Sequence, residues 1–383
     1  MDLTLTPEQE LIRASAREFA ERELAPHARD WDRDETMDRA VVAKLAEAGF
    51  LGAGWGEEYG GGGLDTVSYS LVVEELGKAD SSVRGVVSVN VGLVGKTVAR
   101  FGSEEQKQQW LPRLASGEAL GCYALTEPGC GSDAAALATR AVRDGSDWVL
   151  TGSKTFITLG TWASVALVFV RTGGEGPRGI TCFVVPTDAS GFEARPIKGK
   201  LGLRAQDTAE LSLDGVRIPD TARLGELGGG FRVAMSALDL GRISLASGCV
   251  GIAQGCLEAS VRYAQERRAF GKAIAGFQLV QELIADTAVE TEAARLLVWR
   301  AAALADAGLP HTLESSVAKL YASETAVRAA NAAVQVHGGY GYVDEYPVGK
   351  YLRDARVTTL YEGTSQIQKL IIGRALTGES AFT

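Results

Sequence analysis

Glu362 stands in the segment LYEGTSQIQKL (residues 360–370), between a tyrosine and a glycine and just before a predicted helix. Gly363 can adopt backbone angles that other residues resist, and Thr364 or Ser365 can cap the helix. Free backbone N–H groups at a helix start can hold an oxygen that gains negative charge. A carboxylate beside them suits removal of a proton next to a carbonyl. The alternative is that Glu362 only supports the helix N-terminus by its charge.

A second polar segment, ALTEPGCGSD (residues 124–133), begins at the end of an apolar run and turns through proline and glycine. Thr126, Ser132 and Asp133 place polar groups in a loop where backbone amides are free. Such a loop suits a ring-shaped ligand with carbonyls and ring nitrogens, or a phosphate. An ordinary turn is the alternative.

The segment WVLTGSKTFIT (residues 148–158) predicts a strand, a glycine turn, and then Phe156, Ile157 and Thr158. These three residues could lay an aromatic face and a hydroxyl against a planar cofactor. A simple hairpin is the alternative.

A fourth segment, ERRAFGKAIAGFQ (residues 266–278), places two arginines and Phe270 between two predicted long helices. Guanidinium groups bind pyrophosphate in a forked geometry. The alternative is a solvated helix end.

Three stretches of different pattern must position these segments. Residues 7 to about 118 show helical periodicity, with Thr6 as a possible N-cap and Pro7 at the first helical position. From about 120 to 220 come short apolar or alternating runs separated by turn residues, with a turn predicted at Asp214-Gly215. Helical spacing then returns to about residue 337, and a last helix begins near 364. The chain therefore reads as helices, a small β domain, and a helical bundle.

Composition excludes several classes of function. The net charge is −9 and no basic tract is present, which argues against general nucleic-acid binding. Five cysteines form no C-x-x-C pair and three histidines lie far apart, so no metal site is predicted. An odd number of cysteines fits a reducing compartment. No signal peptide, transit peptide or run of 18 apolar residues is present, so we expect a cytoplasmic enzyme with no membrane contact.

Taken together and in this order, the motifs resemble those of the FAD-dependent acyl-CoA dehydrogenase family. The resemblance runs from about residue 7 to 376 and rests on TEP-x-x-GSD, G-x-K-x-(aromatic)-I-T, ER-x-x-FG, QV-x-GG-x-G and YEGT-x-QIQ. It implies an α+β multidomain fold. An all-α N-terminal domain (1–119) would precede a β-barrel-like middle domain (120–226) and a C-terminal four-helix bundle domain (227–383).

The resemblance also implies that FAD lies between the β domain and the C-terminal helices. The positions that match the family's FAD-binding residues near the flavin are Tyr123, Leu125, Thr126, Ser132, Phe156, Ile157 and Thr158, and Thr364 and Gln366 complete the cofactor-binding set. The positions that match those contributed by a neighbouring subunit are Arg267, Phe270, Gln278, Gln335 and Gly339. A homo-oligomer, typically a tetramer, is therefore expected. Many members of the family have tryptophan where Phe156 stands.

By the same resemblance, Glu362 is the base that takes the α-proton of an acyl thioester while a hydride leaves the β-carbon for flavin N5. Ser132, Asp239 and Arg242 match residues that meet the substrate. Some members place their glutamate one residue before this arginine, where this chain has Gly241, so the base is expected at Glu362.

The expected reaction converts a short or medium acyl-CoA into the trans-2-enoyl thioester and passes electrons to an electron-transfer flavoprotein, in fatty acid or amino acid catabolism. An acyl group on a carrier protein, in secondary metabolism, is an alternative substrate, because it presents the same pantetheine thioester. An acyl-CoA oxidase and a non-catalytic flavoprotein are further alternatives. The retained Glu362 and Arg242 argue against the last of these.

Overall fold

The computed structural model describes residues 4–382. Its first third is helical, as predicted. Thr6 caps the first helix by a reciprocal capping box with Gln9: the Thr6 hydroxyl accepts from Gln9 N at 3.2 Å, and the Gln9 side chain accepts from Thr6 N at 3.1 Å. The helical segments of this part are α1 (Pro7–Phe19), η1 (Ala20–Leu24), α2 (Ala28–Asp34), α3 (Ala40–Glu47), α4 (Thr66–Ala79), α5 (Ser81–Val87), η3 (Ser88–Gly95), α6 (Lys96–Phe101) and α7 (Glu104–Ala115).

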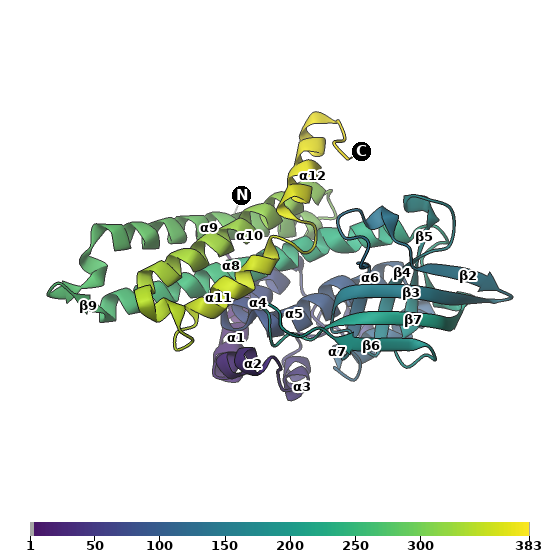
Figure 1. The fold of residues 1–383 in the computed structure, drawn as a ribbon, viewed down its shortest axis with the longest axis horizontal. Coiled ribbons are helices and arrows are strands. Elements are labelled where there is room, and N and C mark those ends of the chain that lie inside the picture. The colour runs from purple at the N-terminus through teal and green to yellow at the C-terminus, as the bar shows by residue number, and fades with distance from the viewer. Residues whose placement is uncertain (1–3, 383) are drawn as a thin grey trace.

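The middle of the chain forms an eight-stranded sheet in the order β6-β7-β3-β2-β4-β5-β8, with β1 paired in parallel to β4. It lies at one end of the molecule (Figure 1). Its strands are β1 (Gly121–Ala124), β2 (Arg140–Asp144), β3 (Asp147–Thr158), β4 (Val165–Arg171), β5 (Ile180–Pro186), β6 (Phe192–Pro196), β7 (Thr208–Pro219) and β8 (Arg223–Leu224).

Two turns predicted from glycines in this domain are wrong. Gly152 lies inside β3, which continues unbroken to Thr158, and Asp214-Gly215 lies inside β7. The two strands pair with each other, and their register shifts between Leu150 and Thr151, opposite Gly215. Gly215 has φ +68°, so it forms a bulge that bends the pair rather than a turn that ends a strand.

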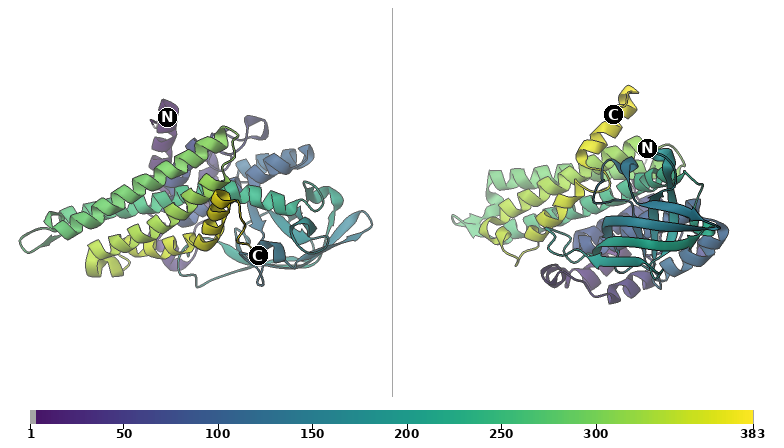
Figure 2. Two further views of the ribbon diagram at one scale, coloured as in Figure 1. Left: turned by 90° about the horizontal axis from the view of Figure 1, so that it is seen from above. Right: turned by 45° about the vertical axis from the view of Figure 1, so that its right-hand side comes forward.

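The last third returns to helices. Figures 1 and 2 show α8, α9 and α10 side by side in the half of the molecule away from the sheet, with the short β9–β10 hairpin at the far end, and only α8 continues to the sheet. The elements are α8 (Gly230–Glu266), β9 (Arg268–Ala269), β10 (Lys272–Ala273), α9 (Gln278–Asp306), α10 (Thr312–His337), α11 (Val348–Thr358) and α12 (Ser365–Thr377). Within the described chain, α8 is the one helix long and apolar enough to cross a membrane, but 72% of its most apolar 18-residue window is buried inside the protein.

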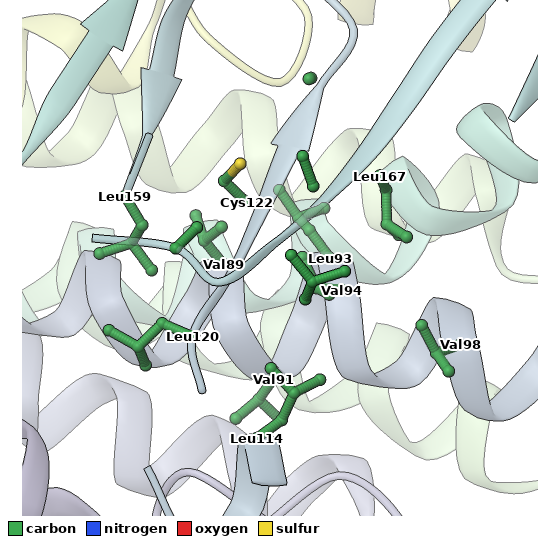
Figure 3. Close-up of a cluster of buried hydrophobic side chains, with 14 of the residues drawn as sticks. Val89, Val91, Leu93, Val94, Val98, Leu114, Leu120, Cys122, Leu159 and Leu167 are labelled. Atoms are coloured by element: carbon green, nitrogen blue, oxygen red, sulfur yellow. The ribbon is translucent and has the colours of Figure 1, made fainter. Parts of the chain in front are cut away.

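Close helix packing joins the N-terminal helices to α8. A Cβ atom on Gly77 of α4 would lie 2.9 Å from the Gly248 carbonyl oxygen of α8, so only glycine allows this approach. A similar contact joins the helices to the sheet, because a Cβ on Gly121 of β1 would lie 2.5 Å from Val94 of η3. Figure 3 shows the apolar cluster at this junction, where η3 side chains pack beneath β1 and β4. The helices and the sheet therefore share one rigid core.

Candidate active site

Glu362 lies on the loop between α11 and α12, as the sequence predicted. Its backbone is left-handed, with φ +54°, and Gly363 follows at φ +89°. A non-glycine residue in this region stores strain, which is common at functional sites. Thr364 rather than Ser365 caps α12: its hydroxyl accepts from Ile367 N at 3.2 Å, while Ser365 donates to Glu324 at 2.6 Å.

Four hydrogen bonds from three side chains hold the backbone of this loop. Gln368 Nε2 lies 3.1 Å from both the Glu362 and Gly363 carbonyl oxygens. Lys319 Nζ donates to the Gly363 carbonyl at 2.7 Å, and Arg242 Nε donates to the Glu362 carbonyl at 3.5 Å. These bonds fix the two residues in their uncommon conformation.

Glu362 is half-buried as a residue, but its Oε2 atom is buried and finds no hydrogen-bond partner within residues 4–382. Burial raises the pKa of Glu362, while the nearby cations Arg84, Lys319 and Arg242 oppose that rise. A desolvated carboxylate with a raised pKa is a stronger proton acceptor than one in water. This oxygen is therefore placed to take a proton.

Gly241 of α8 faces this carboxylate. A Cβ atom at that position would lie 2.6 Å from Glu362 Oε2 and 2.8 Å from Leu93 Cδ2, so a larger side chain would collide with the acid. A side chain at position 241 would therefore occupy the same place as the carboxylate of Glu362, although 121 positions separate the two residues in sequence.

Asp239 and Arg242, both predicted to meet substrate, form an ion pair one turn apart on α8. Arg242 Nη1 lies 2.6 Å from Asp239 Oδ1, and Thr312 donates to the other oxygen of Asp239 at 2.7 Å. Arg242 is thereby neutralised by its own helix and kept beside the Glu362 backbone.

A buried ion pair in the β domain holds the predicted cofactor loop. Lys154 Nζ lies 2.7 Å from Glu127 Oε1 and donates to the carbonyl oxygens of Leu125 at 3.1 Å and Phe169 at 2.6 Å. The Thr126 carbonyl accepts from Thr155 N at 3.0 Å. The backbone of the TEP segment is therefore tied to β3 at adjacent residues.

The other predicted cofactor residues of this domain lie around that loop. Tyr123 donates through its hydroxyl to the Ala234 carbonyl at 3.2 Å, and Ser132 lies on the exposed part of the loop. Phe156 holds its ring 68% exposed, with φ +58°, at a register shift of β3. Thr158 accepts from Gln206 at 3.1 Å. Ile157, predicted to share this face, has a side chain only 2% exposed in the core, so any ligand contact would come from its backbone.

The structure does not bring all predicted cofactor residues together within one chain. Arg267 and Phe270 lie at the β9–β10 hairpin, Gln278 begins α9, and Gln335 and Gly339 lie at the end of α10. Figure 1 shows this distal end opposite the sheet, with α12, which begins after Thr364 and carries Gln366, between the two ends.

The residues present fit the FAD that the resemblance implies. An exposed aromatic side chain stands on strained backbone at Phe156, which suits contact with a flat ring. The loop glycines Gly129 and Gly131 have open space around them, so a ligand could approach their backbone. Arg267 and Gln335 are exposed and offer donors of the kind that pyrophosphate binds.

Sequence reasoning missed several residues of this site. Arg84 and Lys319 carry no spacing signal, because their partners lie far away along the chain. Glu127 and Lys154 belong to the motifs TEP-x-x-GSD and G-x-K-x-(aromatic)-I-T, but nothing in their spacing indicated that they pair with each other. Gln368 belongs to the quoted segment at residues 360–370, so its position after a helix cap could have indicated a side chain that reaches back to the loop.

Comparisons with known proteins agree with this architecture. The acyl-CoA dehydrogenase N-terminal, middle and C-terminal domain families match residues 6–118, 122–216 and 228–377. The chain is 45% identical to the mitochondrial short-chain specific acyl-CoA dehydrogenase of Mus musculus, over 95% of this chain and 88% of that protein.

Solved structures are similar as well. A structure described as the electron transferring flavoprotein of Acidaminococcus fermentans contains a chain with 43% identity and a TM-score of 0.97, covering 99% of this chain and 100% of that one. A glutaryl-CoA dehydrogenase from Mycobacterium smegmatis in complex with FADH2 has 39% identity and a TM-score of 0.95, covering 99% and 97%. The chain belongs to the acyl-CoA dehydrogenase family and is a FAD-dependent oxidoreductase that acts on acyl-CoA.

Proposed function

We propose that this enzyme dehydrogenates a short acyl-CoA to the trans-2-enoyl thioester, with Glu362 as the base. The observation that carries the proposal is the buried, unpartnered Oε2 of Glu362, held on a strained loop that faces Gly241. FAD supplies the acceptor for the hydride that leaves the β-carbon.

The chain's own residues account for the proton half of the reaction. Oε2 of Glu362 receives the α-proton, and the C–H electron pair becomes part of the new double bond. Burial keeps competing water away and strengthens the base. The hydrogen bonds from Gln368 and Lys319 hold the backbone, so the carboxylate does not have to be ordered during the reaction.

Short chain length is supported by the relatives, since the Mus musculus protein is named as short-chain specific. A carrier-protein-bound acyl group is the alternative substrate. An electron-transfer flavoprotein is the proposed acceptor, supported by the similar chain in the Acidaminococcus fermentans structure.

Assembly into a homo-oligomer, with a tetramer as the expected form, is proposed from the distal end. There Phe270 is 95% exposed and Arg267 lies over Tyr340, with its guanidinium carbon 5.6 Å from the ring centre. A second copy of the chain would cover this surface. The donors on the surface, such as Arg267, would then reach the FAD bound in that second copy. A cytoplasmic location is proposed because all five cysteines are free thiols.

The test is anaerobic bleaching of the purified flavoprotein by acyl-CoAs of graded length. We expect the fastest bleaching with butyryl-CoA and slower bleaching as the chain lengthens. If no CoA thioester bleaches the flavin but an acyl-carrier protein does, the carrier-protein alternative would replace the CoA assignment. No bleaching by either class would contradict the proposed function.

A further inference from the structure

Five arginine or lysine residues are buried in the described part of the chain, and they divide into two groups. Three have a carboxylate partner: Lys154 with Glu127 at 2.7 Å, Arg242 with Asp239 at 2.6 Å, and Arg295 with Glu74 at 3.0 Å. The other two, Arg84 on α5 and Lys319 on α10, are 3% and 0% exposed and have no carboxylate within 4.0 Å between residues 4 and 382. A buried charge without a counter-charge is costly, so these two cations call for an explanation.

Both unpaired cations hold the residues that flank Glu362. Arg84 Nη2 donates to the Tyr361 hydroxyl at 3.0 Å, and Lys319 Nζ donates to the Gly363 carbonyl at 2.7 Å. The other side-chain hydrogen bond of Arg84 is weak, with Nη1 3.4 Å from Ser88 Oγ, and its Nε has no partner in the part of the chain that the structure describes. One cation therefore donates a hydrogen bond to the residue before Glu362, and the other donates a hydrogen bond to the residue after it.

The charge of these cations acts on Glu362. The titratable groups that interact with it come from five helices or strands and from its own loop: Tyr69 (α4), Arg84 (α5), Tyr123 (β1), Arg242 and Cys249 (α8), Lys319 (α10) and Tyr361. Among the three cations, Arg242 is already paired with Asp239. Arg84 and Lys319 therefore supply the uncompensated positive charge that opposes protonation of the buried carboxylate.

We propose that Arg84 and Lys319 are positioning residues for Glu362: they clamp the Tyr361-Glu362-Gly363 segment and keep its buried carboxylate ionised at neutral pH. This role rests on the proposed function, in which Glu362 is the base. It would explain how a desolvated carboxylate stays ready to accept a proton before substrate arrives. It would also explain why two buried cations are tolerated without acids of their own.

The test is the pH profile of anaerobic flavin reduction by butyryl-CoA in Arg84→Met and Lys319→Met. Loss of a nearby positive charge should move the acid limb of the profile to higher pH by about one unit, because the carboxylate then protonates more readily. The rate measured below the limb should fall about tenfold. Arg84→Lys, which keeps the charge, should restore the limb toward its wild-type position.

Lys350→Met is the matched control for loss of a lysine that is largely enclosed, with a side chain 10% exposed, but paired with carboxylates. Lys350 lies on α11, where it pairs with Asp354 at 2.6 Å and Asp80 at 3.1 Å, so its loss should lower thermal stability and leave the acid limb in place. A second measurement is independent of turnover. Infrared titration of each variant, with Glu362→Gln subtracted to isolate the Glu362 carboxyl band, should show protonation at higher pH than in the wild type.

Three outcomes overturn the inference. One is an unmoved limb and an unmoved infrared titration in both folded methionine variants. Another is a limb shift in Lys350→Met of the same size. The third concerns Arg84 alone. In this outcome Arg84→Met reduces flavin more slowly with glutaryl-CoA but at the wild-type rate with pentanoyl-CoA, and the acid limb of its pH profile does not move. Arg84 would then bind a substrate carboxylate instead. If Glu362→Gln itself reduces flavin at the wild-type rate, it is the proposed function that fails.

Discussion

The two ends of the C-terminal helices are built in opposite ways. At the end nearer the sheet, called the proximal end, side chains of α8, α10 and α12 donate hydrogen bonds to the Glu362 loop of the same chain. At the distal end, Arg267, Phe270 and Gln335 are exposed. Chemistry that needs a desolvated base is prepared by burial within one chain. A binding surface that needs free donors and aromatic faces is left open for another molecule.

The largest expected effect is at the proximal end. Glu362→Gln keeps the shape of the side chain but removes the proposed base, so the rate of flavin reduction by butyryl-CoA should fall by about 10²–10⁴-fold. Bound FAD should be retained, as measured by the ratio of flavin to protein absorbance. Glu193→Gln, at an exposed glutamate of β6, should leave the rate unchanged. Wild-type reduction in Glu362→Gln would place the base elsewhere.

The next largest effect is expected from the buried ion pair of the β domain, which holds the predicted cofactor loop. Lys154→Met leaves Glu127 buried without its partner and removes the ties to the Leu125 and Phe169 carbonyls, so the free energy of unfolding should fall by about 3–5 kcal/mol. The measurement is a denaturant melt of the FAD-bound protein. Arg195→Met removes an exposed ion pair on β6, and its melt should shift by less than about 1 kcal/mol. Equal shifts would mean that the buried pair does not hold this domain.

A moderate effect is expected at the distal end. Arg267→Ala removes donors proposed to reach FAD across a subunit boundary, so FAD affinity should weaken by roughly ten- to a hundredfold, the usual value of a hydrogen bond to a charged group. The unfolding of the polypeptide should change little, because Arg267 is exposed. Dialysis followed by flavin quantification measures this. Full FAD occupancy of Arg267→Ala after dialysis would contradict this prediction, since the distal end would then have no part in cofactor binding.

The smallest effect is on stability and its dependence on pH. The pKa of Glu362 is raised in the folded state above the value of about 4.5 expected when unfolded, so the folded state binds more protons between these two pKa values. Folding therefore loses stability as pH rises through this window. Glu362→Gln should raise the melting temperature at pH 7, and the gain should vanish at a pH below 4.5, where both states of the wild type are protonated. A gain that persisted there would have a cause other than ionisation.

Local pattern predicted a good part of this structure. The three-stretch plan, the capping of α1 by Thr6, and the place of Glu362 just before a helix all follow from residues within a few positions of one another. The same local reasoning was wrong at Gly152 and Gly215, because glycine also marks bulges inside strands, and only strand pairing distinguishes a bulge from a turn. It also grouped Ile157 with its more exposed neighbours Phe156 and Thr158, whereas successive side chains of a strand point to opposite faces and that of Ile157 lies in the core.

The sequence by itself determined the loop that carries the acid: a tyrosine, a glutamate, a glycine that permits a left-handed turn, and a threonine that caps the next helix. Only the tertiary structure decided the acid's environment. Arg84, Arg242 and Lys319 meet at Glu362 because α5, α8 and α10 pack together, and no spacing along the chain encodes that meeting. Desolvation and charge act through space, so the proton affinity of Glu362 was settled by packing rather than by its neighbours in sequence.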